Sequence, residues 1–289
     1  GYHFPKKGIA HFPYKKLIYF SIPLIGFAFF TTLQRSIDLY FVKLLTTDGK
    51  MVGFYTANQN ISQIPFFALS AFSLVMFPSI SKSVSLKDHA KTNKLIVSAM
   101  RYILILLAPL TAVIAITSGQ ILSMLYTSIY LPGARSLSIL VVGVAFITVL
   151  TLLSNILSGA GDIKKPFFIA VGSTILSGFL CLFLIPSLGL EGAAIATTTS
   201  AFISLMAACL YIYRRFGVLI SLSSFLKISL ATLALSLIIA IVKVPDILLP
   251  VVSVFAFGLY ILILTATKEL TRDDLLVSLV LKWKKIISA

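Results

Sequence analysis

The chain has 289 residues, of which 58% are hydrophobic and 11% are charged, and its mean hydropathy is +1.04. A soluble globular chain is nearer half apolar and a quarter charged, so this composition excludes an ordinary soluble enzyme or binding domain. The net charge of +15 would suit a nucleic-acid binder, but no basic run is interleaved with aromatic residues as a single-strand-binding groove requires. We therefore expect a membrane protein that binds no nucleic acid.

The first segment, 1–16, is polar and basic and contains two prolines. It lacks the apolar core and the small-residue cleavage site of a signal peptide, so we interpret it as a cytoplasmic linker. The chain does not begin with methionine, and we expect it to be a fragment or a processed form.

The chain then continues in apolar blocks of about 20 residues, the length that crosses a hydrocarbon layer of ~30 Å. The blocks predict an all-α fold, a polytopic transmembrane helix bundle of about eight spans. A short amphipathic piece is expected at 121–130, and Pro23, Pro65 and Pro109 should bend their helices, either as curved packing or as hinges. The expected spans are 17–45, 53–80, 95–117, 134–159, 166–185, 192–213, 225–244 and 247–266.

Positive charges test this arrangement. If the first segment is cytoplasmic and the chain crosses eight times, most of the 24 Lys and Arg residues fall on the cytoplasmic side. This bias is the one that the positive-inside rule requires, so we expect a multi-pass protein of the cell (plasma) membrane with both chain ends cytoplasmic. The exceptions are Arg35 inside the first span and, on the outer side, Lys43, Lys50, Arg135 and Lys243.

The last segment, 267–289, combines leucines and lysines at helical spacing. This pattern is typical of an amphipathic helix that lies on the membrane surface, with Trp283 at headgroup level. We expect it to form a cytoplasmic tail.

Two ionisable residues lie within the first span. Arg35 and Asp38 stand three residues apart, so on one continuous helix they would share a face. An ionised side chain inside the hydrocarbon costs at least ~2.5–3.5 kcal/mol and usually faces a partner or a wet cavity. One interpretation is that the two charges neutralise each other and only stabilise packing. The other is that they line a polar cavity in which Arg35 holds a phosphate.

Amides lie at a similar depth, both before Arg35 and at the start of the second span. An amide in hydrocarbon must form hydrogen bonds, either across helices or with a polar substrate. Interhelical bonding therefore remains the alternative to substrate binding. The candidate substrate-binding residues are Gln34, Arg35, Asp38, Asn58, Asn60 and Gln63.

No catalytic or cofactor motif accompanies these polar groups. The sequence contains no paired carboxylates, no intramembrane His–Glu set, no nucleophile elbow and no Walker loop. Cys181 and Cys209 lie within apolar blocks and lack the spacing of a metal site or a disulfide framework. We expect no enzyme activity, no cofactor and no bound metal.

Three stretches resemble the polysaccharide and lipid-linked oligosaccharide flippases of the multidrug/oligosaccharidyl-lipid/polysaccharide (MOP, MATE-like) exporter superfamily. The first is SIPLIGFAFFTTLQRSIDLYFV (21–42), which leads into VGFYTANQN (52–60) and FPSISKS (77–83). The second is ILSMLYTSIYLPGARSLSIL (121–140) followed by SGAGDIKKP (158–166), and the third is IPSLGLEGAAIATTTS (185–200).

The resemblance implies two six-helix lobes around a central cavity, worked by alternating access. The chain is similar to the second lobe, 17–215, followed by two additional transmembrane helices at 216–266 that fit the fourteen-span members. The first lobe would then be a missing N-terminal partner. Cavities in the superfamily typically carry several cations for an anionic diphosphate lipid, whereas only Arg35 lies deep here.

Three functions are considered for such a chain. The first is a flippase that moves a lipid-linked oligosaccharide or polysaccharide precursor across the cell membrane, with membrane lipid and the lipid-linked sugar as its partners. The second is a cation-coupled multidrug exporter of the same fold, in which Asp38 would bind the coupling ion. The third is a membrane-embedded glycosyl- or acyltransferase, which would need catalytic carboxylates or histidines at one membrane face.

Overall fold

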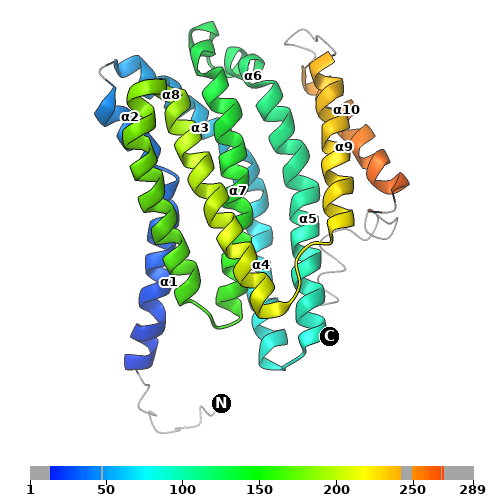
Figure 1. Cartoon of the computed structure of the whole chain (residues 1–289). Coiled ribbons are helices and arrows are strands. Elements are labelled where there is room, and N and C mark those ends of the chain that lie inside the picture. Colours follow the sequence, from blue (N-terminus) through cyan, green and yellow to red (C-terminus); the bar gives the residue numbers. More distant parts are fainter. Residues whose placement is uncertain (1–13, 47, 242–248, 268, 270–289) are drawn as a thin grey trace, which may run out of the picture.

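The computed structural model describes residues 14–46, 48–241, 249–267 and 269, and within them the chain is helical apart from short connections. No strand occurs in this described part, and the helices run side by side as one bundle (Figure 1). The expected all-α membrane bundle is thereby confirmed. In chain order the helices are α1 (Tyr14–Gln34), α2 (Ile37–Leu45), α3 (Gly49–Ser62), α4 (Ile64–Ser85), α5 (His89–Ile116), α6 (Ser118–Leu125), the 3-10 helix η1 (Ser128–Gly133), α7 (Ala134–Gly159), α8 (Lys164–Phe216), α9 (Leu222–Ile241) and α10 (Leu249–Ala266).

Four of the eight predicted spans correspond to single helices. In the described residues, four helical stretches are long and apolar enough to cross a membrane, and two shorter apolar helices accompany them. α5, α7, α9 and α10 each coincide with one predicted span to within a few residues. The long stretches are His89–Ile116, Ser128–Gly159, Lys164–Phe216 and Leu222–Ile241, and the shorter ones are Ser21–Gln34 and Val252–Ala266.

α8 contains two predicted spans that join without a loop. Its backbone reverses at Gly189, where φ is 58° and ψ is −129°, a conformation that residues with a Cβ rarely adopt. Three residues later the chain passes so close to itself that a Cβ on Gly192 would lie 2.1 Å from the carbonyl oxygen of Leu184. Figure 1 shows α8 rising, turning and descending beside itself. Two glycines thus replace the expected loop.

The first two spans are broken, which corrects the prediction of continuous helices. α1 ends at Gln34 and α2 begins at Ile37, so Arg35 and Ser36 form a break in the first span. The second span breaks between α3 and α4. Pro65 does not bend a helix interior as expected, because it lies in the first turn of α4, where its missing N–H has no intrahelical partner to lose. Each span therefore consists of two helical segments.

α7 forms the centre of the bundle and contacts α3, α4, α5, α6 and α8. Leu152, Leu153 and Ile156 on α7 are fully buried. Gly143 lets the second half of α8 approach closely, because a Cβ there would lie 2.9 Å from the Cα of Thr198. Small residues at such contacts are typical of helix packing in membranes.

α9 and α10 pack together and, on the rest of the bundle, mainly against α5. Their shared apolar cluster includes Ile105, Leu235 and Tyr260. The Tyr260 hydroxyl donates a hydrogen bond of 2.9 Å to the Ile105 carbonyl oxygen, which fixes the position of α10 on α5. This pair is an apolar attachment to the bundle.

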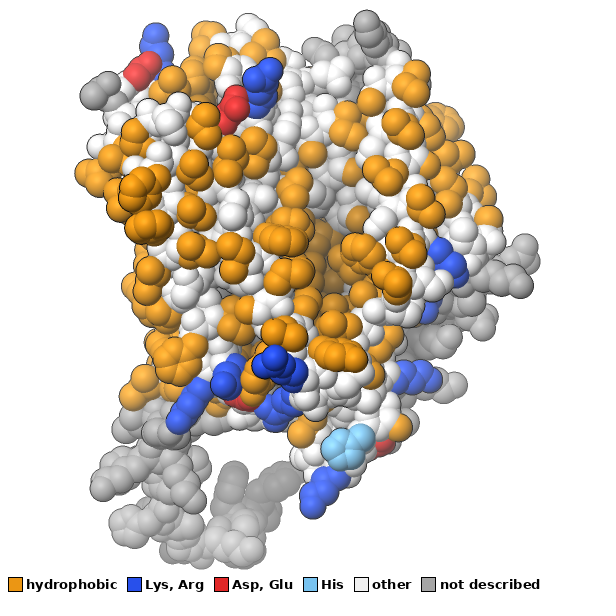
Figure 2. Space-filling model, viewed as in Figure 1, with side chains coloured by type: hydrophobic (Ala, Val, Ile, Leu, Met, Phe, Trp, Pro, Cys, Tyr) orange, Lys and Arg blue, Asp and Glu red, His pale blue; other side chains and the backbone are white. Residues whose placement is uncertain are grey.

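The connections alternate between two ends of the bundle. We call the end where α1 begins the α1 end and the opposite end the far end (lower and upper in Figure 1). Figure 2 shows an apolar belt over the middle, with Lys and Arg gathered mostly toward the α1 end. The α1 end carries the connections at 86–88, 160–163 and 217–221. The far end carries the end of α2, the start of α3, the segment 117–133 and the turn at Gly189.

This alternation agrees with the charge pattern that the sequence predicts, since Lys43, Lys50 and Arg135 lie toward the far end. The cytoplasmic assignment of the α1 end stays a prediction. The amphipathic piece expected at 121–130 corresponds to α6 and η1 at the far end. Most of the linker, 1–13, and the predicted surface helix with Trp283 lie outside the described residues.

Candidate functional site

The break in the first span places Asp38 in the first turn of α2. A carboxylate in the first turn of a helix is stabilised by the exposed N–H groups and the positive end of the helix dipole. The side chain is almost completely buried, with 1% of its surface exposed. The local chain geometry therefore holds Asp38 in a buried position.

Four hydrogen bonds surround the Asp38 carboxylate. Oδ1 accepts from the backbone N–H of Leu39 at 2.8 Å and from Gln59 Nε2 at 2.7 Å. Oδ2 accepts from the Tyr55 hydroxyl at 2.7 Å and from Thr197 Oγ1 at 2.9 Å. Each oxygen thus has two donors, which matches its lone-pair capacity. The bonds connect α2 with α3 and with the second half of α8.

Arg35 does not pair with Asp38, which corrects the expectation of a shared helix face. Because the helix is interrupted at Arg35, the spacing of three residues does not bring the two side chains together. The guanidinium instead lies over the Phe66 ring, 4.3 Å from its centroid, in a cation–π contact. Among the described residues no carboxylate forms an ion pair with it, and its backbone carbonyl accepts from Gln59 Nε2 at 3.1 Å.

A small cavity lies where the two broken spans meet α7 and α8. Its volume is about 10 Å³, which is room for about one water molecule. Arg35, Asp38 and Gln63 line it, and Gln63 is half-buried at the break between α3 and α4. The remaining lining residues are Gln59, Ser62, Leu140, Val144, Ile147 and Thr197. This volume is too small for a sugar or a lipid headgroup.

Two other predicted amides bond across helices. The Gln34 side chain donates from Nε2 to Ser173 Oγ on α8. Asn58 donates from Nδ2 to the Gly133 carbonyl oxygen at 2.9 Å and to Ser136 Oγ at 2.6 Å. Both are fully buried, so interhelical bonding describes these two residues in this structure. Asn60 is exposed on α3 and does not line the cavity.

The structure adds site residues that the sequence-based reasoning missed. Tyr55, Gln59 and Thr197 supply the side-chain donors to Asp38, and Ser62 completes the lining beside Gln63. Tyr55, Gln59 and Ser62 are spaced by four and three residues on α3, and that spacing marks one helix face. The polar face could have been read from this pattern. No sequence pattern singles out Thr197, because it is followed directly by two more threonines.

In the described residues, no group of three or more His, Cys, Asp or Glu side chains could hold a metal ion. The lining of the cavity contains one cation, at the break, and one acidic group whose two oxygens each already accept two hydrogen bonds.

Comparison with known proteins identifies relatives. The family described as lipid II flippase MurJ matches the chain over residues 16–266. A solved structure of lipid II flippase MurJ in an inward closed conformation is similar, with a TM-score of 0.74 and 16% identity, over 91% of this chain and 57% of that one. An outward-facing multidrug resistance MATE family transporter of the MOP superfamily is also similar, with a TM-score of 0.57 and 21% identity, over 88% of this chain and 64% of that one.

Identities this low establish only a shared fold, and the chain spans less than two thirds of either solved protein. No curated protein sequence matches the chain.

Proposed function

The chain belongs to the lipid II flippase MurJ family, and from this premise we propose that it forms one half of a flippase for a lipid-linked sugar precursor with an anionic phosphate linkage. Family membership and the apolar helices identify a multi-pass protein of the cell membrane, a transporter rather than an enzyme. The matched family is one of lipid II flippases, so the substrate we propose is of the lipid II type. It replaces the wider class of polysaccharide precursors that the sequence motifs implied.

The proposal rests on Arg35 as the ligand of the phosphate. Its guanidinium sits at a helix break beside the cavity, stacked on Phe66, and no carboxylate of the described chain neutralises it. A guanidinium that is held by one ring face keeps its N–H groups available for a bidentate bond to a phosphate. Gln63, on the same cavity, would add an amide donor. Asp38 would act indirectly, by fixing the break that presents Arg35.

The size of the cavity supports the inference that a second lobe is required. About 10 Å³ cannot hold a sugar, and alternating access needs two bundles that enclose a site between them. We propose that residues 17–215 are the second lobe, that 216–266 are two additional spans, and that an N-terminal lobe supplies the opposite wall with further cations. The coverage of 57% of the solved flippase agrees with such a division.

The cation-coupled exporter is not favoured. Both carboxylate oxygens of Asp38 already accept two hydrogen bonds each, so a coupling ion would have to displace donors from two or more helices. The membrane-embedded transferase is excluded by the family to which the chain belongs.

The test is Arg35→Gln in the full-length protein, assayed for movement of the lipid-linked precursor across the membrane of vesicles. We expect transport to fall at least about tenfold, because a charge-assisted bond to phosphate is lost. The matched control is Lys43→Gln, which removes an exposed cation from the last turn of α2. That control should transport normally, and expression of both variants should be unchanged.

A second variant separates substrate binding from charge balance. If Arg35 only balanced Asp38, the double change Arg35→Gln/Asp38→Asn would restore what the single change loses. We expect no restoration. Full transport by Arg35→Gln, or its recovery in the double variant, would disprove the phosphate-binding role.

A further inference from the structure

A second, larger pocket lies at the α1 end of the bundle, between the last turns of α4 and the first turns of α5. Its volume is about 120 Å³, against about 10 Å³ for the cavity at Asp38, and the two share no residue. This is room for a group of several heavy atoms. The residues that line it are Pro78, Ser79, Lys82, Ser83, Leu86, Lys91 and Leu95.

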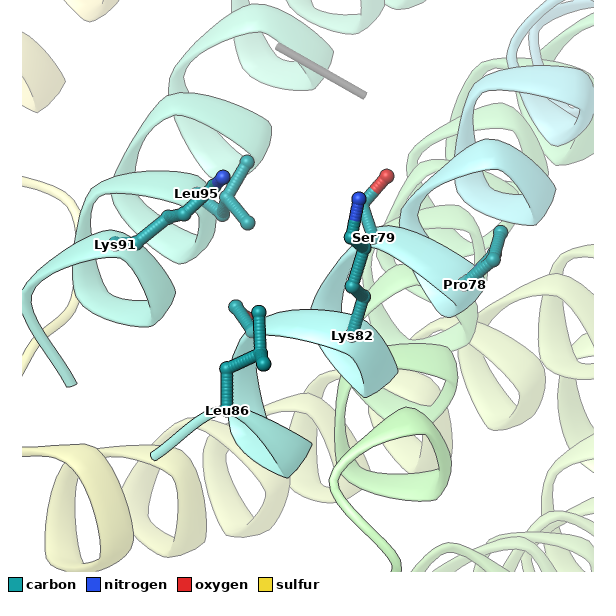
Figure 3. Close-up of a pocket in the computed structure, with 7 residues that line it drawn as sticks. Pro78, Ser79, Lys82, Leu86, Lys91 and Leu95 are labelled. Carbon is teal, nitrogen blue, oxygen red and sulfur yellow. The ribbon is translucent and has the colours of Figure 1, made fainter. Parts of the chain in front are cut away.

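The charged residues that line this pocket are both cations, and Ser79 and Ser83 add hydroxyl groups. Lys82 comes from α4 and Lys91 from α5, and no acidic residue is among those lining the pocket. Figure 3 shows the two lysine side chains extending from facing helices into the space between them, Lys82 beside Ser79 and Lys91 beside Leu95. Asp88 does not line the pocket, and its Oδ1 caps α5 by accepting from the Lys91 backbone N–H at 2.9 Å.

The remaining walls are apolar, formed by Pro78, Leu86 and Leu95. The pocket is lined by the last turns of α4 and the first turns of α5, at the α1 end, toward which Lys and Arg gather (Figure 2). Basic pockets between transmembrane helices on a positively charged side commonly bind anionic headgroups. A phosphate placed between the two ammonium groups would leave the glycerol and the first acyl carbons against the apolar walls.

We propose that this pocket binds the phosphate of an anionic membrane phospholipid, with Lys82 and Lys91 as its ligands. The site is separate from the proposed substrate wall and does not depend on the flippase assignment. A soluble phosphate would have the same charge, but it would make no use of the three apolar walls. The bound lipid bridges α4 and α5, so it would stabilise the α1 end of the second span.

The experiment measures binding of phosphatidylglycerol to the purified full-length protein in a neutral detergent, by native mass spectrometry over a series of lipid concentrations. The test variant is Lys82→Gln/Lys91→Gln. The matched control is Lys87→Gln/Lys94→Gln, which removes two exposed lysines from the same end without touching the pocket. We expect binding to weaken at least about tenfold in the test variant, at about 1 kcal/mol for each lysine, and to be unchanged in the control.

Two further arms separate the possible sources of the phosphate. Phosphatidylcholine should bind the unaltered protein more weakly than phosphatidylglycerol, and inorganic phosphate should compete only weakly. Equal loss in both double variants would indicate nonspecific surface charge and would overturn the proposal. Competition by inorganic phosphate at the affinity of the lipid would overturn the lipid assignment.

Lys82→Arg/Lys91→Arg, which keeps both charges, should retain phosphatidylglycerol. If the neutral double variant cannot be purified, Lys91→Gln alone decides the question. It should show a smaller loss in the same direction, and unaltered binding would overturn the proposal.

Discussion

Asp38 and Glu269 are both nearly buried acidic residues, but the protein accommodates them in different ways. Asp38 is buried between α2, α3 and α8 and is surrounded by four neutral donors. Glu269 follows α10, is 5% exposed, and forms ion pairs with Arg101 at 3.4 Å and Lys227 at 3.3 Å. One acid is therefore balanced by hydrogen bonds and the other by cations.

The exposure of the partners accounts for this difference. Arg101 and Lys227 keep 29% and 36% of their side chains exposed, so solvent lowers the cost of their charges. Asp38 is 1% exposed, and bringing a second ion into its buried surroundings would double the desolvation cost, whereas hydroxyl and amide donors spread the negative charge at little cost. The two acids also have different structural roles. Asp38 connects the two broken spans, and Glu269 attaches α9 and α10 to α5.

The largest effect is expected for Asp38→Ala. Three buried side-chain donors would lose their acceptor, and each unsatisfied buried donor costs about 1–3 kcal/mol, so stability should fall by about 3 kcal/mol or more. Thermal unfolding in detergent measures the loss. Asp38→Asn keeps one acceptor oxygen and should lose less. Equal stability of the alanine variant and the unaltered protein would show that the hydrogen bonds to Asp38 contribute nothing to stability.

A smaller loss is expected for Tyr55→Phe, which removes one donor and leaves the other three bonds to Asp38 in place. A hydrogen bond to a charged group contributes about 1.5–3 kcal/mol, and the loss should lie near the lower value because three donors remain. The control is Tyr40→Phe, since Tyr40 is exposed. If both variants unfold at the same temperature, the Tyr55 hydroxyl contributes nothing to the network.

Glu269→Gln should cost about 1 kcal/mol, because the ion pairs are partly open to solvent through Arg101 and Lys227. Screening should make this loss shrink as salt rises, whereas the loss in Asp38→Ala should not change. Unfolding in low and high salt tests the contrast directly. If the stability loss in Asp38→Ala depended on salt and that in Glu269→Gln did not, the explanation of how the two acids are balanced would be wrong.

The smallest effect is expected for Tyr260→Phe. Its hydroxyl joins α10 to α5 by a neutral bond, and interhelical bonds of this kind average about 0.6 kcal/mol. The same unfolding assay applies, and salt should have no influence. A loss larger than that of Glu269→Gln would mean that α10 is attached mainly by this bond.

The predicted spans followed from hydropathy because about 20 apolar residues must cross the membrane whatever their neighbours are. The breaks in the first two spans could not be predicted in the same way. Arg35 and Ser36 are ordinary helix residues, and the helix is interrupted there while Asp38 is held by donors from α3 and α8, which are remote in sequence. Pro65 indicated an irregularity but not whether it bends or begins a helix.

The candidate site was predicted in part. Sequence depth selected Arg35, Asp38 and Gln63, and in the structure all three line one cavity. It could not separate them from Gln34 and Asn58, because an amide at a given depth can face either a cavity or a neighbouring helix. Thr197 was missed since its partner, Asp38, lies 159 residues away in the sequence.

The turn at Gly189 has a consequence for how the protein is inserted into the membrane. With no loop between the two halves of α8, the fifth and sixth spans cannot adopt their orientations separately. They must enter the bilayer as one hairpin, and Lys164, Lys165, Arg214 and Arg215 at its open end all favour the same side. A change of charge at one end of this hairpin would therefore be opposed by the charges at the other, because the two spans are oriented together.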